Sequence, residues 1–189
     1  MQLDIEKSIL QIQKGDSTAF KTLVEEYQQY AFKLAFRIVC NEDDAMDVVQ
    51  ESFIKIWKKI NTYKPEIKFT TWMYKIISNT AIDKLRSIKR NNHINIDDVS
   101  LLCDRMSNEH PDVQVDNIET GQLIRTISES LPEKQKLVFI LKDLQGMDSN
   151  EVENILNMNE TSVKSNLYHA RKGIREKLNK LLSYERRFS

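Results

Sequence analysis

The side chains of this sequence that are best suited to chemistry lie close together near its C-terminus. Residues 160–175 have a helical pattern in which polar side chains lie opposite the apolar positions. These polar side chains are Lys164, Ser165, Asn166, Tyr168, His169, Arg171 and Lys172. Ammonium, guanidinium, amide and hydroxyl groups can reach base edges and phosphates in the major groove of DNA. This set therefore indicates nucleic-acid binding, although a lone histidine such as His169 is also compatible with an ordinary surface position.

No grouping of side chains indicates catalysis. The sequence contains no P-loop, no glycine-rich dinucleotide-binding loop and no Ser/His/Asp set. Its three histidines, at positions 93, 110 and 169, are scattered, and its two cysteines, Cys40 and Cys103, are in no metal-ligand spacing. We therefore expect a protein that is not an enzyme and that uses no cofactor and no metal ion.

The charges of the chain are separated along its length. The sequence has 28 basic and 28 acidic side chains, so its net charge is zero. Residues 61–90 hold seven basic and two acidic side chains and residues 164–189 hold eight and two, whereas residues 91–120 hold one and seven. Two basic zones suit phosphate binding, but solvated helix faces would give the same counts, so charge alone leaves both interpretations open.

Two short helical patterns position the polar set. Residues 149–156 and 160–175 are separated by a turn of about four residues, which is the layout of a helix-turn-helix motif. Asp148 and Glu151 have the spacing of a capping box, and Asn157 tolerates the left-handed conformation that a tight turn needs. Apolar side chains occur where the motif buries them, at Val152, Ile155, Leu156, Met158, Val163 and Leu167. The alternative is an αα-hairpin with a basic outer face.

Apolar residues recur every three or four positions in much of the N-terminal half, which predicts amphipathic helices. These stripes run from Phe20 to Ile38, from Val48 to Ile60 and from about Thr70 to Arg90. Asn41 can cap the second helix, and Pro65 separates it from the third. The second stripe turns the following side chains inward: Val48, Val49, Ser52, Phe53, Ile56, Trp57 and Ile60. Three such helices can enclose a small core.

The stretch from residue 91 to about residue 117 is polar and acidic, with weak periodicity. It predicts a linker, with a short helical turn around residues 99–106. Periodicity returns at Leu123, and a further helix starts with Pro132 in its first turn and stops near Gly146.

Composition supports an all-α protein outside the membrane. Only four glycines and three prolines occur, which disfavours turn-rich β architectures. No run of about 18 apolar residues and no signal-peptide pattern is present. We therefore expect a soluble cytoplasmic protein with no direct membrane insertion.

Several motifs in order resemble a known family. The segments LPEKQKLVFIL (131–141) and TSVKSNLYHARK (161–172) are similar to the sigma-4 domain of extracytoplasmic-function sigma factors, the small members of the sigma-70 family. The segments GDSTAF (15–20), DAMDVVQESF (44–53) and FTTWMYKIISNTAID (69–83) are similar to the sigma-2 domain. The resemblance covers nearly all of the chain except the linker.

The resemblance implies two small helical domains joined by a flexible linker. It implies a sigma-2 domain over residues 1–92, an acidic linker over residues 93–118 and a helix-turn-helix sigma-4 domain over residues 119–185. No third folded domain fits between them. The linker is compatible both with a segment that threads a basic polymerase channel and with a plain solvated tether.

The resemblance also implies a role for particular residues. Binding to the β′ clamp helices of RNA polymerase is implied for Asp47, Gln50 and Glu51, which are otherwise read as a solvated surface. Opening and binding of the −10 promoter element are implied for Tyr63, Lys68, Lys75, Asn79, Lys84 and Arg86. Reading of the −35 element is implied for Lys164, Ser165, Asn166, Tyr168, His169 and Arg171. The nearby Phe69 and Trp72 are either core residues or platforms on which bases stack.

Three positions depart from the family pattern. Glu153 stands where a small alanine is usual, Asn157 where the turn glycine is usual, and Asn166 where arginine is frequent. The carboxylate of Glu153 must leave a tight helix crossing or find a partner.

The implied partners are core RNA polymerase, contacted at its β′ clamp helices and β flap, promoter DNA and an anti-sigma factor. A conventional DNA-binding regulator is the main alternative, and it would bind duplex DNA tightly without polymerase. An adaptor that binds only proteins would leave the two basic zones unexplained.

Overall fold

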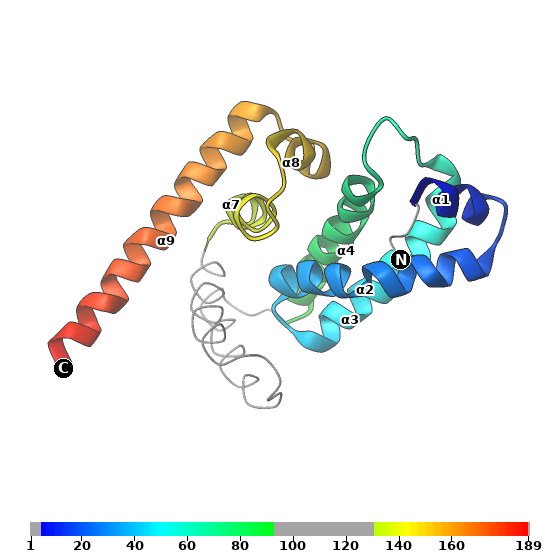
Figure 1. The fold of residues 1–189 in the computed structure, drawn as a ribbon. Coiled ribbons are helices and arrows are strands. Elements are labelled where there is room, and N and C mark those ends of the chain that lie inside the picture. The colour runs from blue at the N-terminus through cyan, green and yellow to red at the C-terminus, as the bar shows by residue number, and fades with distance from the viewer. Residues whose placement is uncertain (1–4, 93–130, 189) are drawn as a thin grey trace. The chain divides into compact units, whose positions relative to one another are not determined.

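The structure, a computed structural model, describes residues 5–92 and 131–188 (Figure 1). All regular elements of these residues are helices, which confirms the all-α prediction. They form two compact units, of which the first consists mainly of the helices up to Arg90 and the second mainly of the helices after residue 130. The predicted linker, the helical turn at 99–106 and the apolar run that starts at Leu123 lie outside the described residues.

The first unit contains the three predicted helices and a helix that the sequence analysis did not predict. In chain order its described elements are α1 (Ile5–Gln13), α2 (Ser17–Val39), α3 (Glu42–Lys59), the 3-10 turn η1 (Ile60–Thr62) and α4 (Phe69–Asn92). The additional helix is α1, which buries Ile9 and Ile12 and packs against α2 and η1. The side-chain amide of Gln13 also donates a 3.0 Å hydrogen bond to the Ile60 carbonyl.

Side-chain caps fix where α2 and α3 begin. The Asp16 carboxylate accepts hydrogen bonds from the amides of Thr18 and Ala19 at the start of α2, at 2.9 and 3.1 Å. The Asn41 side chain accepts one from the Asp44 amide, at 2.9 Å, as predicted. Such caps satisfy amides that have no partner within the helix, and the three acidic residues in the first turn of α3 suit the positive end of its dipole.

The core of the first unit is drawn from the three predicted helices. Side chains that are fully buried come from α2, α3 and α4, and they include Leu23, Leu34, Ile38, Ile56, Met73 and Ile77. Trp57 differs from the prediction, because its side chain is 37% exposed. Its ring lies against Phe20, with 4.8 Å between ring centroids, since position 57 is at the edge of the apolar stripe and the indole is too large to be covered there.

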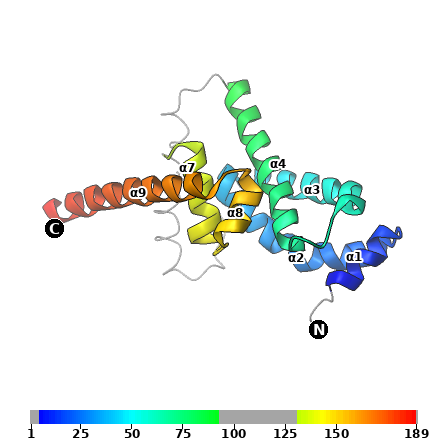
Figure 2. The same ribbon diagram turned by 90° about the horizontal axis from the view of Figure 1, so that it is seen from above.

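The second unit contains α7 (Glu133–Phe139), the π-helical turn η2 (Ile140–Leu144), α8 (Ser149–Leu156) and α9 (Glu160–Phe188). Helix α7 packs across α9 (Figure 2). Phe139, Ala170 and Ile174 form the buried centre of this contact, and Leu131, Leu144 and Leu178 pack against it.

Two boundaries differ from the predicted ones. The helix expected after Pro132 is α-helical only as far as Phe139 and then widens into η2, in which the Gln145 amide bonds to the Ile140 carbonyl at 2.9 Å. Pro132 is the N-cap residue and not part of the first turn. The last helix, predicted over residues 160–175, runs from Glu160 to Phe188.

The helix-turn-helix forms as predicted. The Glu151 amide donates to the Asp148 carboxylate at 2.8 Å, and the Asp148 amide donates to the Glu151 carboxylate at 3.0 Å, which completes the capping box of α8. Asn157 follows α8 with φ 51° and ψ 48°, in the left-handed region. Asn159 then caps α9, because its side-chain oxygen accepts a 2.8 Å hydrogen bond from the Ser162 amide.

Candidate nucleic-acid interface

The first half of α9 presents the predicted donors to solvent. Lys164, Ser165, Tyr168, His169 and Arg171 are all exposed. Val163 and Ala170, which lie on the other side of the same helix, are buried against the rest of the unit. The helix therefore separates a packing face from a polar face.

Tyr168 is the most exposed large apolar side chain on this face. Its side chain is 64% exposed, and its ring meets the His169 ring edge to face at 5.3 Å. An aromatic ring left in water on a basic face suits contact with a base or a thymine methyl group. This arrangement agrees with the polar set identified from the sequence.

Asn166 is turned differently from its neighbours. It is half-buried, and its amide nitrogen donates a 2.8 Å hydrogen bond to the Ser162 carbonyl one turn earlier in α9. One of its two amide hydrogens is therefore already used within the helix. Asn166 is thus less available than Lys164 or Tyr168 to a ligand on this face.

The two predicted cations of α9 are paired with carboxylates. The Lys164 ammonium lies 2.6 Å from Glu160, one turn earlier, and this contact raises the pKa of Lys164. The charge of Glu153 makes a smaller contribution in the same direction. Arg171 pairs with Asp143 of η2, and this hydrogen bond raises the pKa of Arg171.

In the first unit, the predicted aromatics form one cluster. The Tyr63 ring lies 5.6 Å from the Phe69 ring and 5.5 Å from the Trp72 ring, measured between centroids. The Tyr63 hydroxyl donates to the Ile67 carbonyl at 2.9 Å and so closes the loop before α4. Burial raises the pKa of Tyr63. Phe69 is buried, which favours the core interpretation for it, whereas Tyr63 and Trp72 are half-buried.

Four of the predicted −10 residues line up along α4, with three of them inside the helix and Lys68 just before its first residue. Lys68, Asn79 and Arg86 are exposed and Lys75 is half-buried. Their spacings of seven, four and seven residues put them on one side of the helix axis. This side of α4 carries three cations and one amide, which suits contact with a nucleic-acid backbone.

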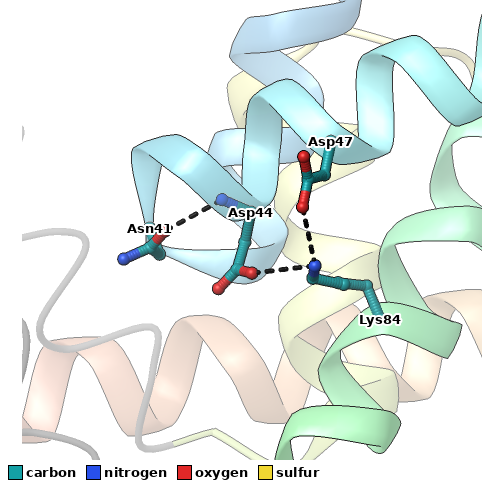
Figure 3. Close-up of polar contacts among 4 residues, drawn as sticks. All are labelled: Asn41, Asp44, Asp47 and Lys84. Atoms are coloured by element: carbon teal, nitrogen blue, oxygen red, sulfur yellow. Dashed lines mark hydrogen bonds and ion pairs between the residues drawn. The ribbon is translucent and has the colours of Figure 1, made fainter.

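Lys84 lies on another side of α4 and belongs to a different arrangement (Figure 3). It follows Ile77 by seven residues and therefore continues the buried stripe of α4. Its ammonium lies 3.0 Å from the Asp47 carboxylate and 3.1 Å from the Asp44 carboxylate, both on α3. The hydrogen bond to Asp47 contributes most to raising the pKa of Lys84, and the hydrogen bond to Asp44 contributes next. The structure thus pairs Lys84, which was predicted to bind DNA, with Asp47, which was predicted to bind polymerase.

A second lysine makes a similar link between α3 and α4. The Lys55 ammonium lies 2.8 Å from Glu51 and donates a hydrogen bond to the Thr80 hydroxyl of α4 at 3.1 Å. The carboxylates of Asp47 and Glu51 therefore both lie along the border between α3 and α4, which we call the α3–α4 seam. It consists of Asp44, Asp47, Glu51, Lys55, Thr80 and Lys84.

The side chain of Gln50 lies on the side of α3 that faces α2. It lines a shallow, open groove of about 590 Å³ between α2 and α3, together with Gln28, Gln29, Phe32, Lys33, Met46 and Val49. The three residues predicted for polymerase binding therefore share one helix, but Gln50 faces α2 while Asp47 and Glu51 are bonded toward α4.

The described residues offer no other obvious chemical site. No group of three or more His, Cys, Asp or Glu side chains among them is placed to hold a metal ion. Among the same residues, no helix has the length and apolar character that a bilayer span requires.

Comparisons with known proteins agree with these two units. A model of sigma-70 region 2 matches residues 23–91, and a model of sigma-70 region 4 matches residues 121–174. The sigma-E factor of Haemophilus influenzae, an ECF RNA polymerase sigma factor, is 30% identical over 187 residues, which cover 96% of this chain and 98% of the relative. The ECF sigma factor SigW of Bacillus subtilis is 29% identical over 96% of this chain and all of its own.

Solved structures show the same fold. CnrH, in complex with the cytosolic domain of CnrY, superposes with a TM-score of 0.68 at 20% identity and covers 91% of this chain and 95% of its own. The sigma factor RpoE of Bartonella quintana, in complex with the anti-sigma factor NepR, gives 0.66 at 20% identity, with 85% of this chain and 96% of its own covered. With both regions and a full-length relative matched, this chain belongs to the extracytoplasmic-function (ECF) sigma factors of the sigma-70 family, which are transcription initiation factors.

Proposed function

We propose that this protein binds core RNA polymerase through α3 and directs it to promoters whose −35 element is read by α9 and whose −10 element is bound by the loop at 61–68 and by α4. The observation that carries the proposal is the exposed donor face of α9 on a capped helix-turn-helix. We infer that the protein acts in the cytoplasm, without catalysis, cofactor or metal.

Reading of the −35 element is assigned to the exposed side chains of α9. Lys164, Ser165 and Tyr168 lie within the first three turns, the part of a recognition helix that contacts base edges in the major groove. His169 and Arg171, which are also exposed, follow further along α9. Asn166 is given a minor part, because its amide is bonded within α9.

Binding of the −10 element is assigned to the stripe on α4. Lys68, Lys75, Asn79 and Arg86 provide contacts to a strand backbone, and the half-buried rings of Tyr63 and Trp72 can stack on an unpaired base. Opening a duplex without nucleotide hydrolysis trades base stacking for such contacts. Lys84 is not included in this surface, because its ammonium is held by two carboxylates of α3.

Docking to core polymerase is assigned to the exposed side of α3. Asp47 and Glu51 present carboxylate oxygens to cationic partner helices. Gln50 and the exposed Met46 line the groove between α2 and α3 and extend this surface. Contact of the second unit with the β flap follows from the family. The domain limits 1–92, 93–118 and 119–185 remain part of this proposal.

We also propose an anti-sigma factor as the antagonist of this protein. The proposal is supported by the RpoE structure, in which a sigma factor is held by the anti-sigma factor NepR. An antagonist that covers α3 or the polar face of α9 would block polymerase binding or promoter reading.

Transcription in vitro tests the proposal. Core polymerase and the purified full-length chain are mixed with a promoter library, and start sites are mapped with and without the chain. We expect a defined set of start sites that depends on the chain. Unchanged start-site choice by core polymerase, or tight sequence-specific binding to duplex DNA by the chain alone, would contradict the proposal and favour a conventional regulator.

A set of matched variants tests the docking surface. Asp47→Asn with Glu51→Gln removes two charges while keeping side-chain shape, and we expect roughly fivefold weaker binding to core polymerase. Asp43→Asn is the control, because Asp43 is an exposed carboxylate in the first turn of the same helix. Equal affinities of the double variant and the control in a titration against labelled core would remove this assignment.

A further inference from the structure

The contact between Asp143 and Arg171 has a defined two-bond geometry. The Arg171 Nε donates to Asp143 Oδ2 at 2.8 Å, and Arg171 Nη2 donates to Asp143 Oδ1 at 2.6 Å. Two parallel hydrogen bonds of this kind fix the plane of the guanidinium group as well as its position. Arg171 is therefore oriented before any ligand reaches it.

The aspartate is the anchored member of this pair. Its side chain is 21% exposed, whereas that of Arg171 is 56% exposed. Asp143 belongs to η2, the π-helical turn that follows α7, and π-helical turns are frequent at functional sites because the extra residue shifts the direction of the following side chains. Phe139, one turn earlier, packs against Ala170, the neighbour of Arg171. The core below thus holds both partners in place.

Part of the arginine remains available to a ligand. A guanidinium group has five N–H donors, and the two bonds to Asp143 occupy two of them. The other three, on Nη1 and Nη2, can form a fork toward an acceptor pair on DNA, either two phosphate oxygens or O6 and N7 of a guanine. Arg171 lies about one helical turn beyond Tyr168 on the polar face of α9.

The pair also changes the electrostatics of this face. An arginine without a carboxylate partner attracts every phosphate in every orientation, which strengthens binding to any DNA. Asp143 cancels that net charge but leaves the directed donors in place. Resting on the function proposed above, we propose that Asp143 is a positioning residue for Arg171 and that the pair sets how strongly α9 discriminates promoter DNA from other DNA.

A double-mutant cycle on the holoenzyme tests the inference. The variants are Asp143→Asn, Arg171→Lys, which keeps the charge but loses the fork, and the two combined. The probes are a promoter duplex selected by the wild-type holoenzyme from a library with a randomised −35 element, and a scrambled duplex of the same length. The readout is the ratio of the two dissociation constants, which does not depend on the fraction of folded protein.

We expect Asp143→Asn to lower this ratio roughly fivefold or more, mainly by strengthening binding to scrambled DNA. Asp143→Asn should have no further effect in the Arg171→Lys background, because Asp143 acts through Arg171. Asp148→Asn is the control: it removes the same charge from the same unit, and asparagine caps a helix as well as aspartate does.

Two results would overturn the inference while leaving the proposed function intact. The first is an unchanged ratio of dissociation constants for Asp143→Asn, found while the wild-type holoenzyme does discriminate the promoter duplex from the scrambled one. The other is an equal drop with and without Arg171, or an equal drop for Asp148→Asn. A wild-type ratio near one would instead overturn the proposed function itself, together with the inference.

Discussion

The α3–α4 seam and the polar face of α9 use the same kinds of charged side chain in opposite ways. Lys84 in the seam is 29% exposed and lies between two carboxylates of another helix. Lys164 and Arg171 on α9 are 69% and 56% exposed, and each faces one carboxylate. The seam cation therefore joins α3 to α4, whereas each α9 cation keeps more than half of its side chain in solvent, although Arg171 also links α9 to η2.

Solvent exposure explains this difference. A charge pair that is largely covered, such as Lys84 with Asp44 at 29% and 27% exposed, is screened little by water and salt, so it stabilises the fold and exchanges partners reluctantly. An exposed pair contributes little to stability, because water solvates both partners almost as well when they separate. The Lys164–Glu160 pair, at 69% and 61% exposed, can therefore be replaced by a phosphate at little cost, whereas Arg171 can keep its two bonds to Asp143 and offer its remaining donors. A basic stretch in a sequence can thus contain cations of either kind.

The largest effect that we expect concerns the α9 cations. Lys164→Ala combined with Arg171→Ala should weaken promoter binding by the holoenzyme about tenfold or more, because two directed contacts to DNA are lost. The free energy of unfolding should fall by about 1 kcal/mol at most, mainly through Arg171, because its partner Asp143 is only 21% exposed. Run-off transcription and denaturant unfolding of the same variant check this pair of outcomes. A large loss of stability with intact transcription would reverse the roles of the two regions.

The next effect concerns the seam. Lys84→Met keeps the methylene packing but leaves Asp44 and Asp47 facing each other without a cation, and we expect a loss of about 1–2 kcal/mol in the free energy of unfolding. Promoter binding, measured for the folded holoenzyme, should stay within about twofold of wild type. Lys84→Arg is the control and should retain most of the stability. Loss of promoter binding without loss of stability would return Lys84 to the DNA surface.

The pH dependence of stability should distinguish the seam further. Because the folded-state pKa of Lys84 is raised, its contribution is fully present below the unfolded-state value and is lost as the pH rises through the folded-state pKa. The stability difference between wild type and Lys84→Met should therefore be constant near neutral pH and shrink at strongly alkaline pH. Urea titrations of both proteins measure this difference. A stability difference between wild type and Lys84→Met that grows with pH would rule out the proposed ion pairs.

The smallest effect should come from the exposed pair on α9. Glu160→Gln removes the partner of Lys164, and we expect no resolvable change in the urea midpoint. Promoter affinity should rise by less than about threefold, because Lys164 no longer has to exchange a carboxylate for a phosphate. Fluorescence titration with a labelled promoter duplex resolves a change of this size. Weaker binding would mean that Glu160 orients Lys164 toward DNA.

Local signals made the second unit predictable in detail. The capping box of Asp148 and Glu151, and the left-handed Asn157, each depend on residues within four positions of one another, and α8 has the limits expected from them. The π-helical turn η2 was not predictable in this way. The apolar residues around it, Phe139, Ile140 and Leu141, have no local spacing that distinguishes a π-helical turn from a continuous α-helix.

In the first unit, the individual site residues were predictable from the sequence, but the contacts between them were not. Asp47 and Lys84 are 37 positions apart, and nothing in their local sequence indicates that they form an ion pair. One signal was available: Lys84 follows Met73 and Ile77 by 11 and seven residues, which places it in the buried stripe of α4. The missed helix α1 had a weak signal of its own in the spacing of Ile5, Ile9 and Ile12.

The salt dependence of promoter binding tests the contrast between the two regions most directly. The slope of log affinity against log salt concentration counts the cations that displace counterions from DNA. For the holoenzyme, we predict a slope for Lys84→Met equal to that of wild type, and a slope for Lys164→Ala with Arg171→Ala that is shallower by about two. A shallower slope for Lys84→Met, or a wild-type slope for the double variant, would contradict the account.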